Sequence, residues 1–535
     1  MISMSPAYQA AVVADTRHTV VRAEADIVSP DIVYGASVSS GDAPTSIPAQ
    51  LHDKVKELSH PYATFELNRW ALNGSKQIYT PGQLQGQQGW ASDTLCGADG
   101  AFSSPVFLQQ DISGAAILQI LTVAFGDGEL DGLPTDYMVS VMSGSTVAWS
   151  KRVTGPTDRV RVFSGFTVTN PTAIRVTVYH WSLPYRRARV AELYPGIYEV
   201  WDNGDITAVA IKQQGDPSCI TLPYGTLSLT LNNATRRFDP GAKDSIFRSL
   251  EERQTIKVYI GVTLPDESAA LAPVGAYYQY QNGWKTGSND MAITWNMVDI
   301  VGLVAGRAYA APDVLPTTLQ GWLTSICVQL GENFRFRAHV AASVANTPVI
   351  ANDAAAVNGR NCGELVRFAC MAAGAWARAS NDGGALLAEA VGGGGGSVTM
   401  GNLSAWPSVQ ANSDVARIDF TVNPAGADAF LYSVAGNRPS CSTTLSINNP
   451  FIHTTAQADA AAALILACYG GNKVNTTGRG NPAQEIGDLD AVQLNPGHTV
   501  QGRRIYQTLN IQSGVLSGCQ SNFLVSDEAM AAQGG

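Results

Sequence analysis

The chain carries one acidic turn whose residue types and spacing match part of a metal-binding loop. In GDGELDG, Asp127, Glu129 and Asp131 stand at the first, third and fifth positions of a calcium loop, and Gly132 stands at the sixth. Met138 occupies the twelfth position, where a bidentate glutamate would complete the coordination sphere, so an EF-hand is excluded. A looser calcium turn and an ordinary acidic hairpin tip both stay open, and we assign no metal ligand.

Other reactive side chains do not occur in a catalytic pattern. Glu251 with Glu252, and Asp488 with Asp490, are too close in sequence to flank a glycosidic bond unaided. A Gly-x-Ser-x-Gly elbow, a His-Glu-x-x-His helix and a Gly-Lys-Ser/Thr loop are all absent. The histidines are dispersed, so a triad would need distant segments to converge; they are His18, His52, His60, His180, His339, His453 and His498. We predict no catalytic residue and no cofactor, and expect that the chain is not an enzyme.

Aromatic and basic residues between 85 and 190 give two further candidate binding sites. The aromatic side chains could stack on a sugar or fill a core, and burial is the default in strands; they are Trp90, Phe102, Phe107, Tyr137, Trp149 and Phe163. At the end of this block, Arg186, Arg187 and Arg189 favour a salt-bridge cluster over an anion site.

Composition indicates a mainly β, multidomain protein. At 535 residues the chain is long enough for several cores, and it combines 15% charged residues with 52 glycines. A net charge of −10 gives no general attraction for phosphate backbones, so we expect no specific nucleic-acid ligand. The eight cysteines show no Cys-x-x-Cys pair and are interpreted as buried thiols. We see no secretory signal and no apolar run long enough to span a membrane, and expect assembly in a cytosol.

Periodicity predicts the elements that must position these residues. Leu227, Leu229 and Leu231 alternate with polar residues, which is typical of a strand with one buried face. We predict a short helix over Pro6–Thr16, a helix after Thr317 or Thr318 with Leu319, Trp322, Leu323, Ile326 and Leu330 on one face, and helices over Gly363–Ala377 and Thr454–Tyr469. ARASNDGGALLAEA predicts a hairpin, and Phe65, Leu67 and Trp70 are predicted to face a core.

One segment of the chain, 224–306, also carries a family likeness. It contains LNNATRRFDP, RQTIKVYIGV and GWKTGSNDMAITWNMVDIVGLVAG, and it resembles the hub module of tailed-phage tail tips. The matching residues are Leu229, Leu231, Asn233, Arg237, Phe238, Asp239, Pro240, Val258, Ile260, Trp295 and Asp299, whereas Ala234 and Thr235 replace the family's Asp-Gly. RGNPAQEIGDLDAVQL resembles the closing strand pair of the same family, and residues 85–190 resemble a galactose-binding-like jelly roll.

The resemblance implies a division into hub-type β-barrel-like domains, a jelly-roll β-sandwich and a small α+β domain. The expected order is an N-terminal β-rich segment (1–84), the jelly roll (85–190), a first hub domain (191–312), the α+β domain (313–400) and a second hub domain (401–535). In that family two similar domains in each of three chains match a sixfold tail tube.

The function implied is that of a structural virion protein at a phage tail tip or baseplate. As a hub subunit it would close the tail tube, connect it to host-binding parts and act during DNA ejection. The resemblance implies a homotrimer whose partners are a distal tail protein, a tape-measure protein and a tail fibre or receptor-binding protein. Two alternatives stay open: an adhesin that recognises host-surface glycan through the jelly roll, and a tail-associated cell-wall hydrolase.

Overall fold

The computed structural model of the chain describes residues 1–531, apart from positions 65, 67, 68, 70, 72, 78–85, 128, 157, 240, 241, 243, 244, 247, 248, 286–290, 332–336, 383, 412, 413, 425 and 427. The predictions made for Phe65, Leu67, Trp70 and Pro240 lie outside the described residues. The predicted fold class is confirmed, because strands dominate and form several separate sheets.

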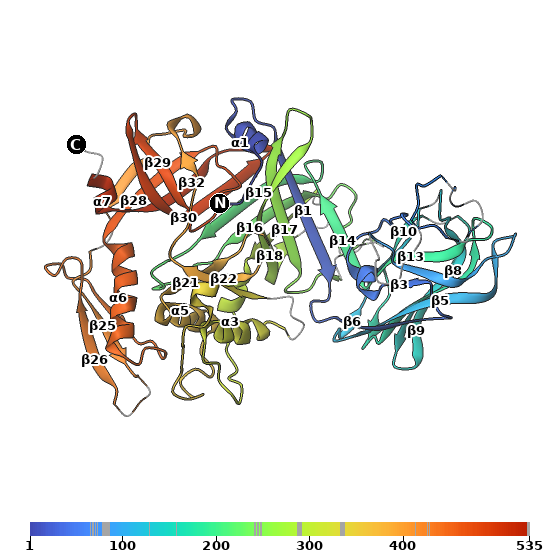
Figure 1. The fold of residues 1–535 in the computed structure, drawn as a ribbon, viewed down its shortest axis with the longest axis horizontal. Coiled ribbons are helices and arrows are strands. Elements are labelled where there is room, and N and C mark those ends of the chain that lie inside the picture. The colour runs from blue at the N-terminus through green and yellow to red at the C-terminus, as the bar shows by residue number, and fades with distance from the viewer. Residues whose placement is uncertain are drawn as a thin grey trace. The chain divides into compact units, whose positions relative to one another are not determined.

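The chain folds into two compact units (Figure 1). The first contains residues 1–24, 200–234 and 255–535, and the second contains 25–199 and 235–254. Strands β1 (Thr19–Val28) and β14 (Gly196–Trp201) carry the chain out of the first unit and back. None of the helices in the described part of the chain is long and apolar enough to cross a membrane.

The second unit is a sandwich of two five-stranded sheets. One has the order β10-β7-β13-β4-β3 and the other β2-β5-β12-β8-β9. Their bounds are β2 (Val33–Ser39), β3 (Thr45–Ser46), β4 (Trp90–Leu95), β5 (Ala101–Ser113), β7 (Leu121–Phe125), β8 (Pro134–Ser143), β9 (Thr146–Thr154), β10 (Val160–Phe163), β12 (Ala173–Trp181) and β13 (Arg187–Tyr194). Inward residues of both sheets share one core, in which Phe125 of β7 meets Tyr137 of β8 edge to face.

The sandwich begins earlier than the expected boundary at residue 85. Strands β2 and β3 belong to its two sheets, where β2 pairs with β5 and β3 pairs with β4. These short strands were assigned to a separate N-terminal segment because their pairing partners lie more than forty residues away. Two further short strands, β6 (Ile117–Leu118) and β11 (Val168–Thr169), pair with each other.

A long antiparallel sheet organises the first unit. Its order is β17-β18-β19-β16-β15-β30-β32-β28-β24, and β15 pairs with β30 although 284 positions separate Gln214 from His498. The bounds are β15 (Ile206–Gln214), β16 (Thr226–Asn232), β17 (Thr255–Thr263), β18 (Ala269–Lys285), β19 (Ala292–Val298), β24 (Ser408–Ala411), β28 (Gly471–Gly478), β30 (His498–Gln512) and β32 (Cys519–Ser526). β29 (Leu489–Asn495) pairs with β30 and with β23 (Ser397–Val398), and β31 (Val515–Leu516) pairs with β30. One sheet thus joins strands from both predicted hub segments.

Helices and two small sheets share a second core of this unit. They are α2 (Ile300–Ala305), α3 (Leu319–Val328), α5 (Cys362–Ala372) and α6 (Thr455–Tyr469), with the sheets β20-β22-β21 and β26-β25-β27. Their strands are β20 (Ala338–Val340), β21 (Ala375–Ala379), β22 (Leu386–Ala390), β25 (Arg417–Val422), β26 (Phe430–Ala435) and β27 (Thr444–Ile447). Figure 1 shows α6 beside β25. This core runs through the expected boundary at residue 400.

Local signals placed the helices well. α1 (Pro6–Val13) starts after Ser5, α3 is capped by Thr318, and α6 starts with a capping box between Thr454 and Gln457. The helix predicted over Gly363–Ala377 is wrong at its end. α5 stops at Ala372, because Gly374 adopts a φ of 66° and turns the chain into β21, whose hairpin with β22 is confirmed. Two short helices, α4 (Ala342–Ala345) and α7 (Asp527–Ala531), complete the unit.

Candidate functional site

Part of the hub-like signature meets on two paired strands of the first unit. Leu229 of β16 lies directly opposite Trp295 of β19, and both are buried. Asp299 follows β19 and caps α2 by accepting hydrogen bonds from Gly302 N at 3.0 Å and Gly225 N at 2.6 Å. Burial raises the pKa of Asp299 to about 6, against the effect of these backbone bonds. The carboxyl group therefore fastens the start of β16 to the end of β19.

The arginines of the signature bind carboxylates of the chain itself. Arg237 donates two hydrogen bonds to Glu199, and Arg236 lies 3.3 Å from Asp239. Phe238, which lies between Arg237 and Asp239 in the sequence, is 4% exposed. The ring of Phe238 therefore anchors this loop, and both arginines are engaged by carboxylates of the chain.

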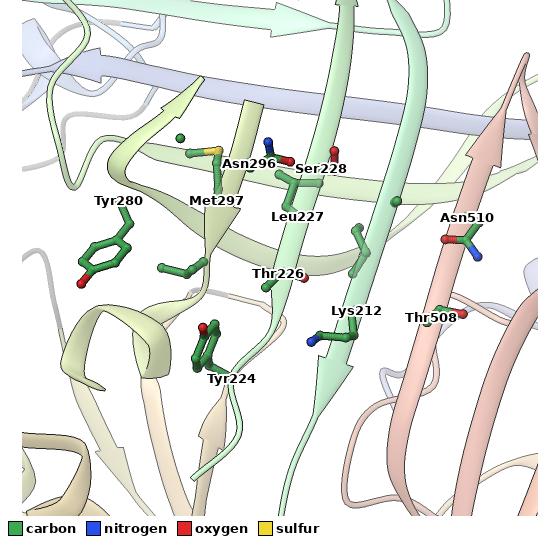
Figure 2. A pocket seen from close by; sticks show the side chains of 14 residues that line it. Lys212, Tyr224, Thr226, Leu227, Ser228, Tyr280, Asn296, Met297, Thr508 and Asn510 are labelled. Atoms are coloured by element: carbon green, nitrogen blue, oxygen red, sulfur yellow. The ribbon is translucent and has the colours of Figure 1, made fainter. Parts of the chain in front are cut away.

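A groove of about 720 Å³ lies on the outward face of β15, β16, β19 and β30 (Figure 2). Alternation in these strands sends leucine, isoleucine and tryptophan inward and leaves small polar residues outward. Across the strands, Asn510, Ala210, Ser228 and Asn296 form one register-matched row. The sheet thereby provides a flat floor of hydroxyl and amide groups.

Two tyrosines and one lysine complete the groove. Figure 2 shows Tyr224 and Tyr280 on the same side of the floor, with Lys212 extended from β15 toward Tyr224. Lys212 has no ion pair with a residue in the described part of the chain. The described residues of the lining include no carboxylate, histidine or cysteine, and they offer hydrogen bonds and ring faces. The arrangement can bind a partner.

Sequence reasoning missed this groove. Its residues are common types, most of them on the five strands β15, β16, β18, β19 and β30, and β30 is remote in sequence from the other four. The only available signal was the alternation itself, which leaves an outward row on β15 and β16 with Lys212 as its single charged side chain.

The acidic pair Asp488 and Asp490 has a structural role. Asp490 is fully buried and accepts hydrogen bonds from Arg504 Nε at 3.0 Å, Arg504 Nη2 at 2.7 Å and Gly396 N at 2.7 Å. Asp488 binds the amino group of Met1 and accepts from Glu485 N at 2.8 Å. Both carboxylates are therefore occupied by groups of the chain itself in this conformation.

The acidic turn is held by basic side chains. Asp131 is fully buried and accepts from Arg69 Nη2 at 2.6 Å, while Asp127 Oδ2 lies 3.0 Å from His60 Nε2. His60, Asp127 and Asp131 place ligand atoms within 4.8 Å of one another, but Glu129 is exposed and does not belong to this group. Asp131 is thus paired with the guanidinium of Arg69, a cation that the chain itself supplies.

Most of the aromatic candidates fill the sandwich core. Trp90, Phe102, Tyr137 and Phe163 are each less than 8% exposed, so their faces are not open to a sugar. Trp149 is partly exposed but stacks on Phe166 with ring centroids 4.2 Å apart. Phe107 is covered by the guanidinium of Arg175 at 4.5 Å.

Comparison with known proteins gives structural similarities at low sequence identity. No protein-family model matches the sequence, and no curated protein matches it. The structure is similar to the 43 kDa tail protein of prophage MuSo2 from Shewanella oneidensis, with 15% identity, a TM-score of 0.41, and coverage of 62% of this chain and 97% of that one. It is similar to a tail protein from Neisseria meningitidis MC58, with 10% identity, a TM-score of 0.42, and coverage of 62% and 94%.

A third similarity is to an E. coli component of the type VI secretion system, which is described as structurally similar to the T4 bacteriophage tail proteins gp27 and gp5. The identity is 11%, the TM-score is 0.35, and the coverage is 60% of this chain and 73% of that one. With TM-scores below 0.5, the likeness by itself assigns no role to any residue of this chain. Two of these three solved structures are tail proteins, and the third is a component of a type VI secretion system.

Proposed function

We propose that the chain is a structural protein of a phage tail tip, acting as a hub subunit. One observation carries the proposal: four residues of the hub-like sequence signature, Leu229, Leu231, Trp295 and Asp299, meet on the β16–β19 pair and the cap that follows it. These residues were selected from sequence alone, and their convergence on paired strands is what a common module requires.

The architecture of the first unit suits a load-bearing part. The β15–β30 pairing joins two groups of antiparallel strands into one sheet. Buried hydrogen bonds reinforce the junction, because Gln507 of β30 donates to Gln213 of β15, and Gln213 donates to Asn381 Oδ1 at 2.8 Å. Such a junction resists shear, since separating the strands would leave buried polar groups without partners.

The hub role gives a reason for two strand groups in one chain. Three copies would present six groups, which matches a sixfold tube. In this role the assembly closes the tube and connects it to host-binding parts during DNA ejection. The partners would be a distal tail protein, a tape-measure protein and a fibre or receptor-binding protein, and the polar groove on the sheet is a surface where one of them can dock.

The enzymatic alternative receives little support from the site. The strongest acidic pair is committed to Arg504 and Met1, and the groove lacks titratable side chains apart from Lys212 and its tyrosines. The proposal is therefore a non-enzymatic virion protein that assembles in the host cytoplasm.

Light scattering over a concentration series tests the hub role directly. A trimer of the 56.4 kDa chain is expected at the higher concentrations. Antibody labelling of tailed particles from the source strain is the second measurement, and the label is expected at the tail tip. A chain that stays monomeric and is also absent from purified particles would overturn the proposal.

A further inference from the structure

The second unit contains a small cavity whose charged lining is entirely basic. The cavity measures about 190 Å³, and its titratable lining residues among those described are His60, Tyr62, Arg69, Arg187 and Arg189. No carboxylate lines it. A cavity lined by positive charge is unexpected in a chain with a net charge of −10. Acidic residues outnumber basic ones, so every basic residue could have had an acidic partner at the surface.

Two buried carboxylates behind the cavity hold the arginines in place. Asp131 and Glu66 have fully buried side chains; Arg69 binds Asp131 through Nε and Nη2, and Arg189 Nη2 binds Glu66. Burial acts to raise the pKa of Glu66, but Arg189, the backbone N–H of Arg187 and Arg69 outweigh it and lower that pKa. Glu66 therefore stays ionised and keeps the guanidinium groups oriented. Of the three arginines predicted to form a salt-bridge cluster, Arg189 forms ion pairs here, whereas the side chain of Arg187 binds backbone carbonyls.

The cluster does not use all of its donors. Arg187 donates hydrogen bonds from Nη1 to the carbonyl oxygens of Ser92 and Asp93. Its Nε and Nη2 make no hydrogen bond with a described residue. Arg189 Nε is buried 3.2 Å from Asp131 Oδ1 but lacks hydrogen-bond geometry. On the same lining, Thr45 Oγ1 is buried without a hydrogen-bond partner. Buried polar groups are normally satisfied, so Thr45 Oγ1 and Arg189 Nε point to a missing ligand, and the half-buried Arg187 on the same lining has donors left to bind it.

We propose that this cavity binds an oxyanion on a hydroxyl-bearing group, such as the carboxylate of a sugar acid or the phosphate of a sugar phosphate in a surface polysaccharide. Guanidinium groups bind carboxylate and phosphate through paired hydrogen bonds, and Thr45 can bind a neighbouring hydroxyl. The cavity is smaller than a typical site for a drug-sized ligand, so it takes one charged sugar residue of a longer chain. This inference stands independently of the hub role.

Arg187 is the residue to substitute, because its side chain binds only backbone carbonyls. The ion pairs of Glu66 and Asp131 with Arg69 and Arg189 should therefore remain in the variant. Isothermal titration of the full chain would use glucuronate and glycerol phosphate at millimolar concentrations, with glucose as the neutral probe. We expect saturable binding of at least one anion and none of glucose. Preference for glucuronate or for glycerol phosphate identifies the source of the oxyanion.

Arg187→Gln should weaken that binding at least tenfold. Arg175→Gln is the matched control, since Arg175 lies on β12, pairs with Gln109 and does not line the cavity, and it should leave the affinity unchanged. Thr45→Val keeps the shape of the side chain and should weaken binding several-fold, which preserves a test if Arg187→Gln does not fold. Absence of saturable anion binding by the wild-type chain would overturn the proposal, as would equal affinity in a folded Arg187→Gln or Thr45→Val protein.

Discussion

Replacing Arg504 by methionine should destabilise the first unit strongly. Arg504 is 2% exposed and joins β30 to β29 through two hydrogen bonds with Asp490. Its Nη1 also donates to Ser521 Oγ at 2.6 Å and to Gln507 Oε1 at 3.3 Å, and the guanidinium lies 4.8 Å from the centre of the Phe523 ring. Methionine preserves much of the packing against Phe523 and removes every one of these hydrogen bonds.

The expected loss follows from what happens to Asp490. In the Arg504→Met protein, the carboxylate of Asp490, which is 0% exposed, would keep the hydrogen bond from Gly396 N and lose those from Arg504. Breaking a buried ion pair by removing one partner costs about 3 to 5 kcal/mol, because the remaining charge is buried without compensation. Arg504→Met should therefore lower the free energy of unfolding of this unit by about 3 to 5 kcal/mol. Adding Asp490→Asn should recover part of that loss, since the buried charge is then absent.

Urea unfolding followed by circular dichroism measures the change. Arg438→Met is the matched control, because Arg438 is 66% exposed and its pair with Asp414 is screened by solvent, so its loss should change stability little. A loss below about 1 kcal/mol in a folded Arg504→Met protein would refute the reasoning.

Three further predictions concern other elements of the first unit. Burial raises the pKa of Asp299 from its usual 3.8 to about 6, so its ionisation should cost stability as the pH rises from about 4 to 6; the shift corresponds to about 3 kcal/mol, and Asp299→Asn should flatten this part of a urea-midpoint profile. An unchanged profile in that variant would contradict the assignment. Leu229→Ala should cost about 2 to 5 kcal/mol in the same unfolding assay because Leu229 is fully buried opposite Trp295, whereas a loss below about 1 kcal/mol would show that the site collapses. Thr454→Ala should cost about 1 kcal/mol by removing the capping box of α6, and faster amide exchange at the start of α6 is the measurement that checks it.

The sequence determined the elements whose signals are local. Alternation in β16 identified its buried leucines, and side-chain caps identified the starts of α3 and α6. These predictions held because alternation and capping depend on residues within one turn or one strand. The end of α5 was missed because Gly374, rather than the apolar pattern, decides where the chain turns.

The tertiary structure decided which distant segments meet. The β15–β30 pairing, and the use of β2 and β3 by the sandwich, depend on hydrogen bonds between segments whose separation leaves no trace in a local pattern. The groove, the Asp490–Arg504 pair and the basic cavity all arise from such meetings. Asp131 shows the difference. Its spacing from Asp127 and Glu129 fits a calcium turn, but in the folded chain its buried carboxylate binds Arg69. The sequence fixes only the neighbours of Asp131 along the chain, whereas folding selects its partner in space.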